Sequence, residues 1–478
     1  MTSAAMTNEE GWARVERWGR EPRMNDLEAL MWRSEEHPSH ASSGIILEIL
    51  ETVPDWERFR AAHAWGSGLV PRLRERVVEP LLPIGTPAWS LDPEFDLDYH
   101  VQRARLPEPA GMDELLELAR SIGQTPLDRS RPLWAGTLID NLEGGRAAYI
   151  LHSHHSLLDG QGMIELFNSL HSTGPEPSAD KPTGTADGSQ AAGPLALTIN
   201  DLAHGLRSAP RGAARLLGTA RNAVTGPGKT LGFIGSLRRV VSIPPDAAPS
   251  PLLERQTGRL WRYGVLECEL AELKAAGRAA GGSVNDAYVA ALLGGIRRYH
   301  EAIGLELGDI PIGMPVSIRR PDDPPGGNRF TGAFFAAPAG SADPAERIAT
   351  IRGTVLSIRE EPALDVMGSA ATVLCHLPSP LLRNLMRAAV PRADLSASNM
   401  PGMSAPTYAA GAKVERMFVF APLPGVAMMT SMVSYVGTCC IGINADGQVY
   451  EDTELLWKCM REGLHEVLEL GRVAEPQS

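Results

Sequence analysis

Strand-like and helical patterns alternate along the chain. The runs 43–50, 133–140 and 147–152 have the apolar composition of strands. The stretches 111–122 and 285–299 are longer and have the apolar spacing of helices. Because both kinds of element are interleaved, the sequence predicts an α/β fold rather than an all-α or all-β one.

Residues 417–443 contain no charged side chain and are nominally long enough to cross a bilayer. Pro422, Pro424, Gly425 and Gly437 interrupt it, and residues of these two types break a helix. The last part of the stretch is rich in residues that suit a buried strand pair. We therefore predict core β-structure here.

A stretch of linker-like composition separates two parts of the chain. Residues 174–195 are rich in Gly, Pro, Ser, Ala and Thr and have little apolar periodicity, which indicates a linker. Residues 202–245 contain seven Arg or Lys and no Asp or Glu. Two interpretations of this basic segment stay open. It is either an amphipathic segment that lies on an anionic membrane, or a crossover helix whose arginines are solvated or touch the acidic body.

Length, charge and cysteine content narrow the class of protein. The chain has 478 residues, enough for two domains of roughly 200–250 residues each. Its formal net charge of −12 argues against nucleic acid as a partner, because phosphate binding needs a basic surface. Five cysteines without a CxxC pair favour reduced thiols in the cytoplasm, and the polar N-terminus lacks the pattern of a secretory signal.

The motif HHxxxDG occupies residues 154–160 and suggests proton abstraction. A histidine suits this role because its ordinary pKa of about 6.5 leaves much of it neutral at cellular pH. The motif follows the strand-like run 147–152 and precedes an apolar stripe at helical spacing, Met163, Leu166, Phe167 and Leu170. It is therefore predicted to form a tight loop between a strand and a helix.

The paired histidines have two simpler interpretations, as metal ligands or as polar groups satisfied at a strand end. A zinc site would need further ligands at recognisable spacing, and none is evident, so no metal is expected. If the strand persists through the motif, His152 and His154 share one face and His155 takes the other. Only one histidine of the pair can then point into a given cavity.

Further motifs agree with this interpretation, and together they resemble the bacterial wax ester synthase/diacylglycerol acyltransferase family, a branch of the HHxxxDG CoA-dependent acyltransferases. The resemblance runs almost end to end. Its blocks are NDLEALMW (25–32), VPRLRER (70–76), FDLDYH (95–100), PLDRSRPLW (126–134), SVND (283–286), PVSIR (315–319), GN (327–328), SNMPG (398–402) and SYVG (434–437).

The resemblance implies two lobes similar to chloramphenicol acetyltransferase, each a mixed sheet flanked by helices, with a tunnel between them. On this basis residues 1–173 form the N-terminal lobe that carries HHxxxDG. Residues 174–250 form the linker and basic crossover segment, and residues 251–478 form the C-terminal lobe.

The resemblance also implies catalytic roles. His155 is expected to act as the general base and His154 to support it. Asp159 is expected to shape the loop with Gly160, and Arg74 is the candidate partner of Asp159. The reaction implied is acyl transfer from a CoA thioester to a hydroxyl, without an acyl-enzyme, because the chain has no Gly-x-Ser-x-Gly elbow or CxxC-type nucleophile.

Residues of the second half are expected to contribute to substrate binding. Asn285, Ser398 and Asn399 are the candidates, and either Asn285 or Ser398 could stabilise the oxyanion. Asp286 has a structural interpretation, because Ser283 followed three residues later by Asp286 is typical of a helix capping box. The segment 398–402 is predicted to form a turn that leads into a strand.

Three departures from the family pattern concern the substrate pocket. Ser156 replaces a common Ala, residues 249–255 replace a more usual block, and Met429 stands where Asn is frequent. The acceptor could therefore differ from the diacylglycerol or fatty alcohol that the family implies.

The resemblance implies acyl-CoA as a co-substrate, no cofactor and a lipid alcohol as acceptor. One alternative is another acceptor, such as a glycolipid or polyketide, or a carrier-protein thioester as donor. Another is a lipid- or CoA-binding protein without catalysis, which the intact motif disfavours. We expect a cytoplasmic enzyme, compatible with peripheral contact to a membrane or lipid droplet. The sequence does not predict its oligomeric state.

Overall fold

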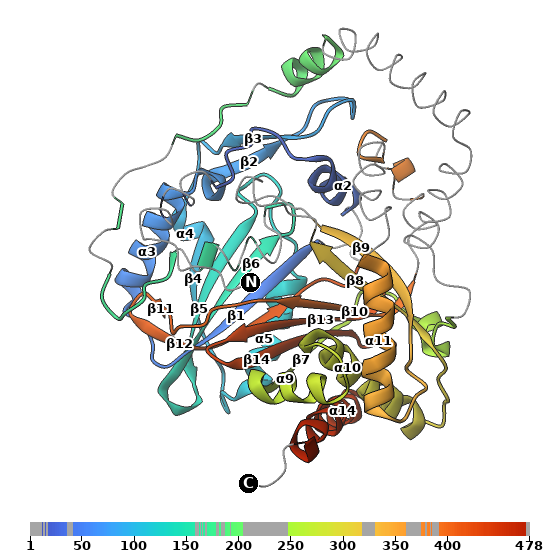
Figure 1. Cartoon of the computed structure of the whole chain (residues 1–478). Coiled ribbons are helices and arrows are strands. Elements are labelled where there is room, and N and C mark those ends of the chain that lie inside the picture. Colours follow the sequence, from blue (N-terminus) through green and yellow to red (C-terminus); the bar gives the residue numbers. More distant parts are fainter. Residues whose placement is uncertain are drawn as a thin grey trace, which may run out of the picture.

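Two six-stranded mixed sheets form the framework of the protein (Figure 1). The computed structural model describes most of the chain. The described residues are 12, 15, 18–35, 42–157, 162, 164, 166–167, 170–177, 181–182, 187–191, 193–203, 247–317, 330–359, 374–377, 380–382, 384 and 392–474.

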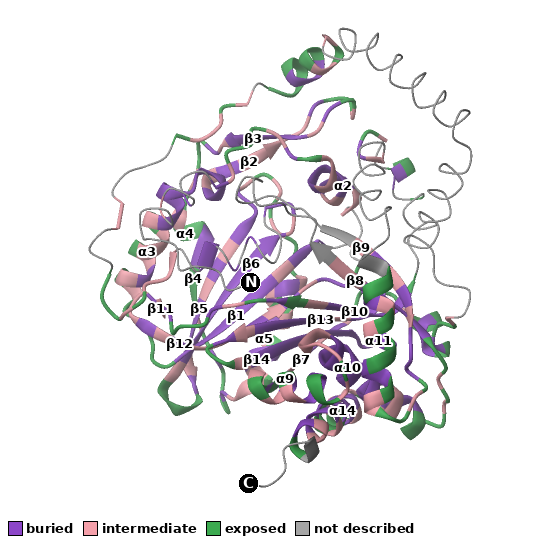
Figure 2. Ribbon diagram, in the orientation of Figure 1, coloured by how far each residue is buried: buried purple, intermediate pink, exposed green. Residues whose placement is uncertain are grey.

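The first sheet has the strand order β11-β12-β1-β6-β5-β4. Its strands are β1 (Ser43–Leu50), β4 (Val101–Arg105), β5 (Trp134–Leu142), β6 (Arg146–His154), β11 (Tyr408–Ala409) and β12 (Ala412–Phe420). All neighbouring strands are antiparallel except β4 and β5. Nearly every residue of β1 and β6 is buried, so both faces of the sheet are covered at its centre (Figure 2).

The second sheet has the strand order β7-β14-β13-β10-β8-β9. Its strands are β7 (Trp261–Glu269), β8 (Ile310–Ser317), β9 (Phe330–Ala337), β10 (Ala393–Met400), β13 (Val426–Tyr435) and β14 (Thr438–Asp446). Strand β10 runs parallel to both of its neighbours. A separate hairpin pairs β2 (Glu75–Val78) with β3 (Ala88–Leu91).

Helices pack around both sheets. They include α2 (Asp26–Ser34), α3 (Trp56–Leu69), α4 (Leu97–His100), α5 (Met112–Gln124), α9 (Leu270–Ala279), α10 (Val284–Ala302), α11 (Pro344–Arg359) and α14 (Thr453–Ala474). In the second half, α10 lies between α9, α11 and α14, which explains why most of its side chains are buried. Helix α5 contacts both β1 and β7 and so bridges the two halves.

The two sheets meet along β12, which packs against β13 and β14. The amide of Asn444 donates to the carbonyl of Ala421 at 2.9 Å, and the hydroxyl of Tyr435 donates to the carbonyl of Val414 at 2.9 Å. Gly442 lies against the backbone of β12, where any side chain would collide. The junction is therefore closely packed and hydrogen-bonded.

The structure confirms the predicted α/β class and most of the predicted elements. Strand β1 has the predicted bounds, while β5, β6, α5 and α10 start or end one to three residues from the prediction. The uncharged stretch 417–443 runs through β12, β13 and β14, as predicted. No helix in the described part of the chain combines the length and apolar character that crossing a bilayer requires.

Two features differ from the sequence analysis or extend it. The segment 398–402 does not lead into a strand, because Ser398, Asn399 and Met400 are the last residues of β10 and Pro401 follows its end. Strands β11 and β12 come from the second half of the chain yet complete the first sheet. The domain boundaries at 173/174 and 250/251 stay predictions, and most of the basic segment 202–245 lies outside the described residues.

Candidate active site

The histidine pair lies where β6 ends. His154 is the last residue of β6, and His155 follows in a turn. The N–H of His155 donates to the carbonyl of Ser42 at 2.6 Å, next to the start of β1. The strand ends one residue too early for side-chain alternation to place His155, so this turn sets the direction of its side chain.

The amphipathic helix predicted after the motif is present where the chain is described. Residues 162, 164, 166–167 and 170 are helical, and Leu166 and Phe167 of the predicted stripe are buried. The motif therefore connects a strand to a helix, as predicted. Leu158, Asp159 and Gly160 lie outside the described residues.

Both ring nitrogens of His154 are hydrogen-bonded. Nε2 lies 2.7 Å from Oε2 of Glu35, and Nδ1 lies 2.6 Å from Oγ of Ser156. The backbone N–H of Ser156 also donates to Nδ1 at 3.0 Å. The side chain of His154 is 1 % exposed, so water does not compete for these contacts.

These contacts assign the proton of His154. A backbone N–H can only donate, so Nδ1 accepts from Ser156 and the ring proton lies on Nε2, where it is donated to Glu35. In this arrangement His154 has no nitrogen left to accept a proton from a substrate. Its contacts suit a residue that holds the loop in place.

Glu35 is a residue of this site that the sequence analysis missed. It follows the last turn of α2, and its second oxygen accepts the N–H of Ser42 at 2.9 Å. Burial alone would raise the pKa of the Glu35 carboxyl, but the hydrogen bonds from His154 and Ser42, with the nearby Arg129, hold it below its ordinary value. A carboxylate at a helix C-terminus is disfavoured by the helix dipole, so its partner His154 explains its position better than helix stability does.

Helix α2 is held firmly, which fixes the position of Glu35. It starts with a capping box between Asn25 and Glu28. The ring of Trp32 meets the imidazole of His154 edge-on, with centroids 5.8 Å apart. The guanidinium of Arg129 lies 3.5 Å above the Trp32 ring and donates to the Trp32 carbonyl at 2.9 Å. Two segments of the resemblance, 25–32 and 126–134, thus meet beside the motif.

The three histidines around the end of β6 differ in exposure. His152 and His154 are buried, whereas His155 is partly exposed. Burial lowers the pKa of His152 to about 4, so this ring is neutral at pH 7. His155 is therefore the most accessible histidine of this group.

The predicted partner of Asp159 lies in a defined environment. The guanidinium of Arg74 stacks on the ring of Phe95, with Cζ 5.0 Å from the ring centroid. Since Asp159 is outside the described residues, the pairing of Arg74 with it stays a prediction.

The candidate binding residues of the second half lie on the second sheet and its helices. Asn285 is in the first turn of α10, and its amide makes a long contact of 3.7 Å with Sδ of Met314. Ser398 and Asn399 lie at the end of β10. The capping box of Ser283 and Asp286 is present, as predicted. The roles of Asn285, Ser398 and Asn399 toward substrate stay predictions.

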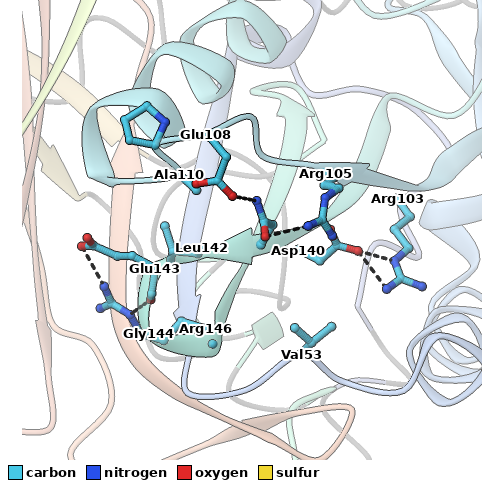
Figure 3. A pocket seen from close by; sticks show the side chains of 13 residues that line it. Val53, Arg103, Arg105, Glu108, Ala110, Asp140, Leu142, Glu143, Gly144 and Arg146 are labelled. Atoms are coloured by element: carbon cyan, nitrogen blue, oxygen red, sulfur yellow. Dashed lines mark hydrogen bonds and ion pairs between the residues drawn. The ribbon is translucent and has the colours of Figure 1, made fainter.

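A surface pocket of about 620 Å³ lies at one end of the first sheet (Figure 3). It is lined by the ends of β4 and β5 and by the turn into β6, and Asp140 accepts a hydrogen bond from Arg103 there at 2.9 Å. Arg146 starts β6 at this pocket and His154 ends the strand, a separation of roughly 26 Å at 3.3 Å per residue. The pocket is therefore not the site around the motif.

Within the described residues, no group of three or more His, Cys, Asp and Glu could hold a metal ion.

Comparison with known proteins decides the family. Residues 24–288 match the wax ester synthase/diacylglycerol acyltransferase catalytic domain, and residues 326–468 match the C-terminal domain of the same family. The chain belongs to the wax ester synthase/diacylglycerol acyltransferase family. It is therefore an acyltransferase that acts on a lipid acceptor, and acyl-CoA and a lipid alcohol are the substrates that its family implies.

Relatives of this acyltransferase match nearly its whole length. A candidate diacylglycerol O-acyltransferase of Mycobacterium tuberculosis is 39% identical over 471 residues, 96% of this chain and 95% of the relative. A second one from the same organism is 28% identical over 482 residues, 96% of this chain and 91% of the relative.

Solved structures support the fold of this acyltransferase. The wax ester synthase/diacylglycerol acyltransferase of Marinobacter aquaeolei superposes with a TM-score of 0.63 at 20% identity, over 94% of this chain and all of that one. The first condensation domain of the calcium-dependent antibiotic synthetase gives 0.59 at 15% identity, over 96% and 97% of the two chains. The two-lobe fold predicted from the resemblance is thus confirmed.

Proposed function

We propose that this protein transfers a long-chain acyl group from acyl-CoA to the hydroxyl of a diacylglycerol or a fatty alcohol, with His155 as the general base. The observation that carries the assignment of the base is the occupation of both nitrogens of His154 by Glu35 and Ser156. His155 is the adjacent imidazole and is partly exposed.

The reaction needs one base and no covalent enzyme intermediate. A ring nitrogen of His155 takes the proton of the acceptor hydroxyl while the oxygen attacks the thioester carbonyl. The C–S bond then breaks, and the thiolate of CoA leaves and takes the proton from the imidazolium. One ester forms, one thioester breaks, and His155 returns to its neutral state.

The negative charge on the carbonyl oxygen needs a donor, and Asn285 suits this role. Its amide N–H is directed at a thioether sulfur 3.7 Å away, which is a weak acceptor that a substrate oxygen could replace. Ser398 at the end of β10 is the second candidate. Removing a donor of this kind typically lowers kcat by about 10²–10³.

The test measures CoA release by purified protein from palmitoyl-CoA with dipalmitoylglycerol, hexadecanol or no acceptor, and identifies the ester by mass spectrometry. We expect release that depends on one of the two lipids and a matching ester. Release with neither lipid, while an alcohol of another class is esterified, would overturn the proposed acceptor. Comparing Asn285→Ala with Ser398→Ala identifies the oxyanion donor as the variant with the larger loss of kcat.

A further inference from the structure

Exposed aliphatic side chains gather on one surface of the first half of the protein. The loop between β2 and β3 exposes Leu81, Leu82 and Ile84, which are 64%, 50% and 38% accessible. The helix at 194–203 exposes Leu195, Ile199 and Leu202, which are 61%, 55% and 47% accessible. We call these six residues the aliphatic patch. The green helix near the top of Figure 1 and the β2–β3 loop below it carry the patch, and the helix is mostly exposed in Figure 2.

The three helix residues of the patch lie on one helical face, because they are spaced at i, i+4 and i+7. The opposite face carries Leu197, which is buried, and Thr198 is buried at the edge of the stripe. The helix therefore uses one apolar position to dock on the protein and leaves an apolar stripe exposed. An exposed stripe of this kind, adjoining a second set of exposed aliphatic side chains, is typical of an interaction site.

Specific contacts join the two parts of the patch. The N–H of Leu81 donates to Oγ1 of Thr198 at 2.8 Å. Asp201 forms an ion pair with Arg23 at 2.9 Å and packs against Gly85, where a side chain would collide with its carboxylate. The aliphatic side chains are thus presented by a fixed arrangement of loop and helix.

The β2–β3 loop is also bound to helix α2, which positions the loop of the histidine motif. Arg33 of α2 contacts both ends of the loop, since it donates to the carbonyl of Gly85 at 2.8 Å and pairs with Glu79 at 3.2 Å. Two residues after Arg33, Glu35 binds His154. The aliphatic patch therefore belongs to the same structural unit as the histidine motif.

We infer that the aliphatic patch docks the enzyme on a lipid surface, from which the acceptor reaches His155. This inference rests on the proposed lipid acceptor. All six residues are Leu or Ile, whereas interfaces between proteins depend on Trp, Tyr and Arg. The sequence that continues from the helix, residues 204–245, adds seven basic residues and no acidic ones, which matches a surface with anionic headgroups.

The test measures binding to vesicles without turnover. Wild-type protein and two double variants, Leu81→Gln with Leu82→Gln and Leu195→Gln with Ile199→Gln, are floated with vesicles of phosphatidylcholine and phosphatidylglycerol. Glutamine is used so that charge repulsion by the anionic lipid does not contribute. Ile303→Gln with Leu356→Gln is the matched control, because these residues are similarly exposed, at 41% and 45%, outside the patch.

We expect each patch variant to bind vesicles at least about tenfold more weakly than wild type, because two aliphatic side chains that would be buried in the lipid are replaced by polar ones. The control should bind as wild type does, and circular dichroism should show all variants folded. Turnover of vesicle-borne diacylglycerol should fall with binding, while turnover of a short, water-soluble alcohol should not.

Three results would overturn the inference: wild-type protein that does not float, patch variants that float as well as wild type, or patch variants that change the oligomeric state instead. The last result would assign the patch to a second copy of the chain. Vesicle binding that is lost in the patch variants, in a protein that releases no CoA with any acceptor, would contradict the proposed function and leave the docking surface standing.

Discussion

Substitution of Glu35 tests whether this residue positions the histidine motif. Glu35→Ala leaves the Nε2–H of the buried His154 without its charged acceptor, which should cost about 1–3 kcal/mol in free energy of unfolding. For a cooperative unit of roughly 200 residues, a loss of about 2 kcal/mol lowers Tm by about 4–8 °C. Glu35→Gln keeps an acceptor oxygen, so its loss should be about 1 kcal/mol.

The same substitutions should change catalysis through His155. Loss of the Glu35 contact frees the ring of His154 and the turn that follows it, and a displacement of about 1 Å can cost up to about 10² in rate. We expect kcat of Glu35→Ala to fall between about tenfold and a hundredfold with KM nearly unchanged, and Glu35→Gln to recover most of it.

The acid dependence of stability gives an independent readout. Because the pKa of Glu35 is held below its ordinary value of 4.5, the ionised carboxylate stabilises the fold above that pH. This contribution is lost as the pH falls through the lowered pKa. The difference in unfolding free energy between wild type and Glu35→Gln should therefore be largest near neutral pH and shrink as the pH falls below the ordinary value of 4.5.

A matched pair on the same sheet provides the control. Glu48 of β1 lies 3.0 Å from Nε2 of His171 and is also buried, but it does not touch the motif. Glu48→Gln should lower stability and leave kcat unchanged. Urea unfolding measures the stability of all variants, and steady-state CoA release measures their kcat. Glu35→Ala with wild-type stability and wild-type kcat would refute the positioning role.

Three further substitutions test other contacts. Ser156→Ala removes the hydroxyl from Nδ1 of His154 but keeps the backbone N–H, so urea unfolding should show a loss of about 0.5–1.5 kcal/mol with kcat within about threefold; a collapse of kcat would contradict this. Burial raises the pKa of Asp394 from 3.8 to about 7, so its neutral form stabilises the fold at low pH and this contribution is lost as the pH rises through that range. Asp394→Asn should remove this pH dependence of the unfolding free energy. An unchanged pH dependence would contradict the raised pKa of Asp394. Glu466→Ala leaves the buried Arg347 without its carboxylate and should cost about 3–5 kcal/mol in the free energy of urea unfolding. An unchanged free energy of unfolding would contradict a stabilising role of this ion pair.

Local pattern predicted those parts of the fold that local interactions determine. The bounds of β1 follow from a largely apolar run that contains one charged residue, Glu48, and the start of α10 follows from the capping box of Ser283 and Asp286. The prediction that segment 398–402 leads into a strand was wrong. Its Pro and Gly indicate a turn, but they do not indicate whether the turn precedes a strand or follows one.

Long-range pairing could not be predicted from one sequence. Strand β12 joins β1 across more than half of the chain, and nothing in either run encodes the partner. Glu35 was missed for the same reason, since 119 positions separate it from His154. The available signal was a Glu just after the amphipathic segment 26–34, where the helix dipole disfavours a negative charge.

The motif is local, since it spans only seven residues, and so the sequence alone could predict its place between a strand and a helix. The contacts of its histidines needed the structure, which shows that both ring nitrogens of His154 are hydrogen-bonded and that His155 is partly exposed. The role of His155 as base stays a prediction that activity must test.

The most direct measurement is the rate of acceptor-dependent CoA release by His155→Ala, with unfolding monitored on the same preparation. The account predicts a folded protein whose kcat is lower by about 10²–10⁴, the range that a general base supplies. A folded His155→Ala whose kcat stays within about tenfold of wild type would contradict the assignment of His155 as the base.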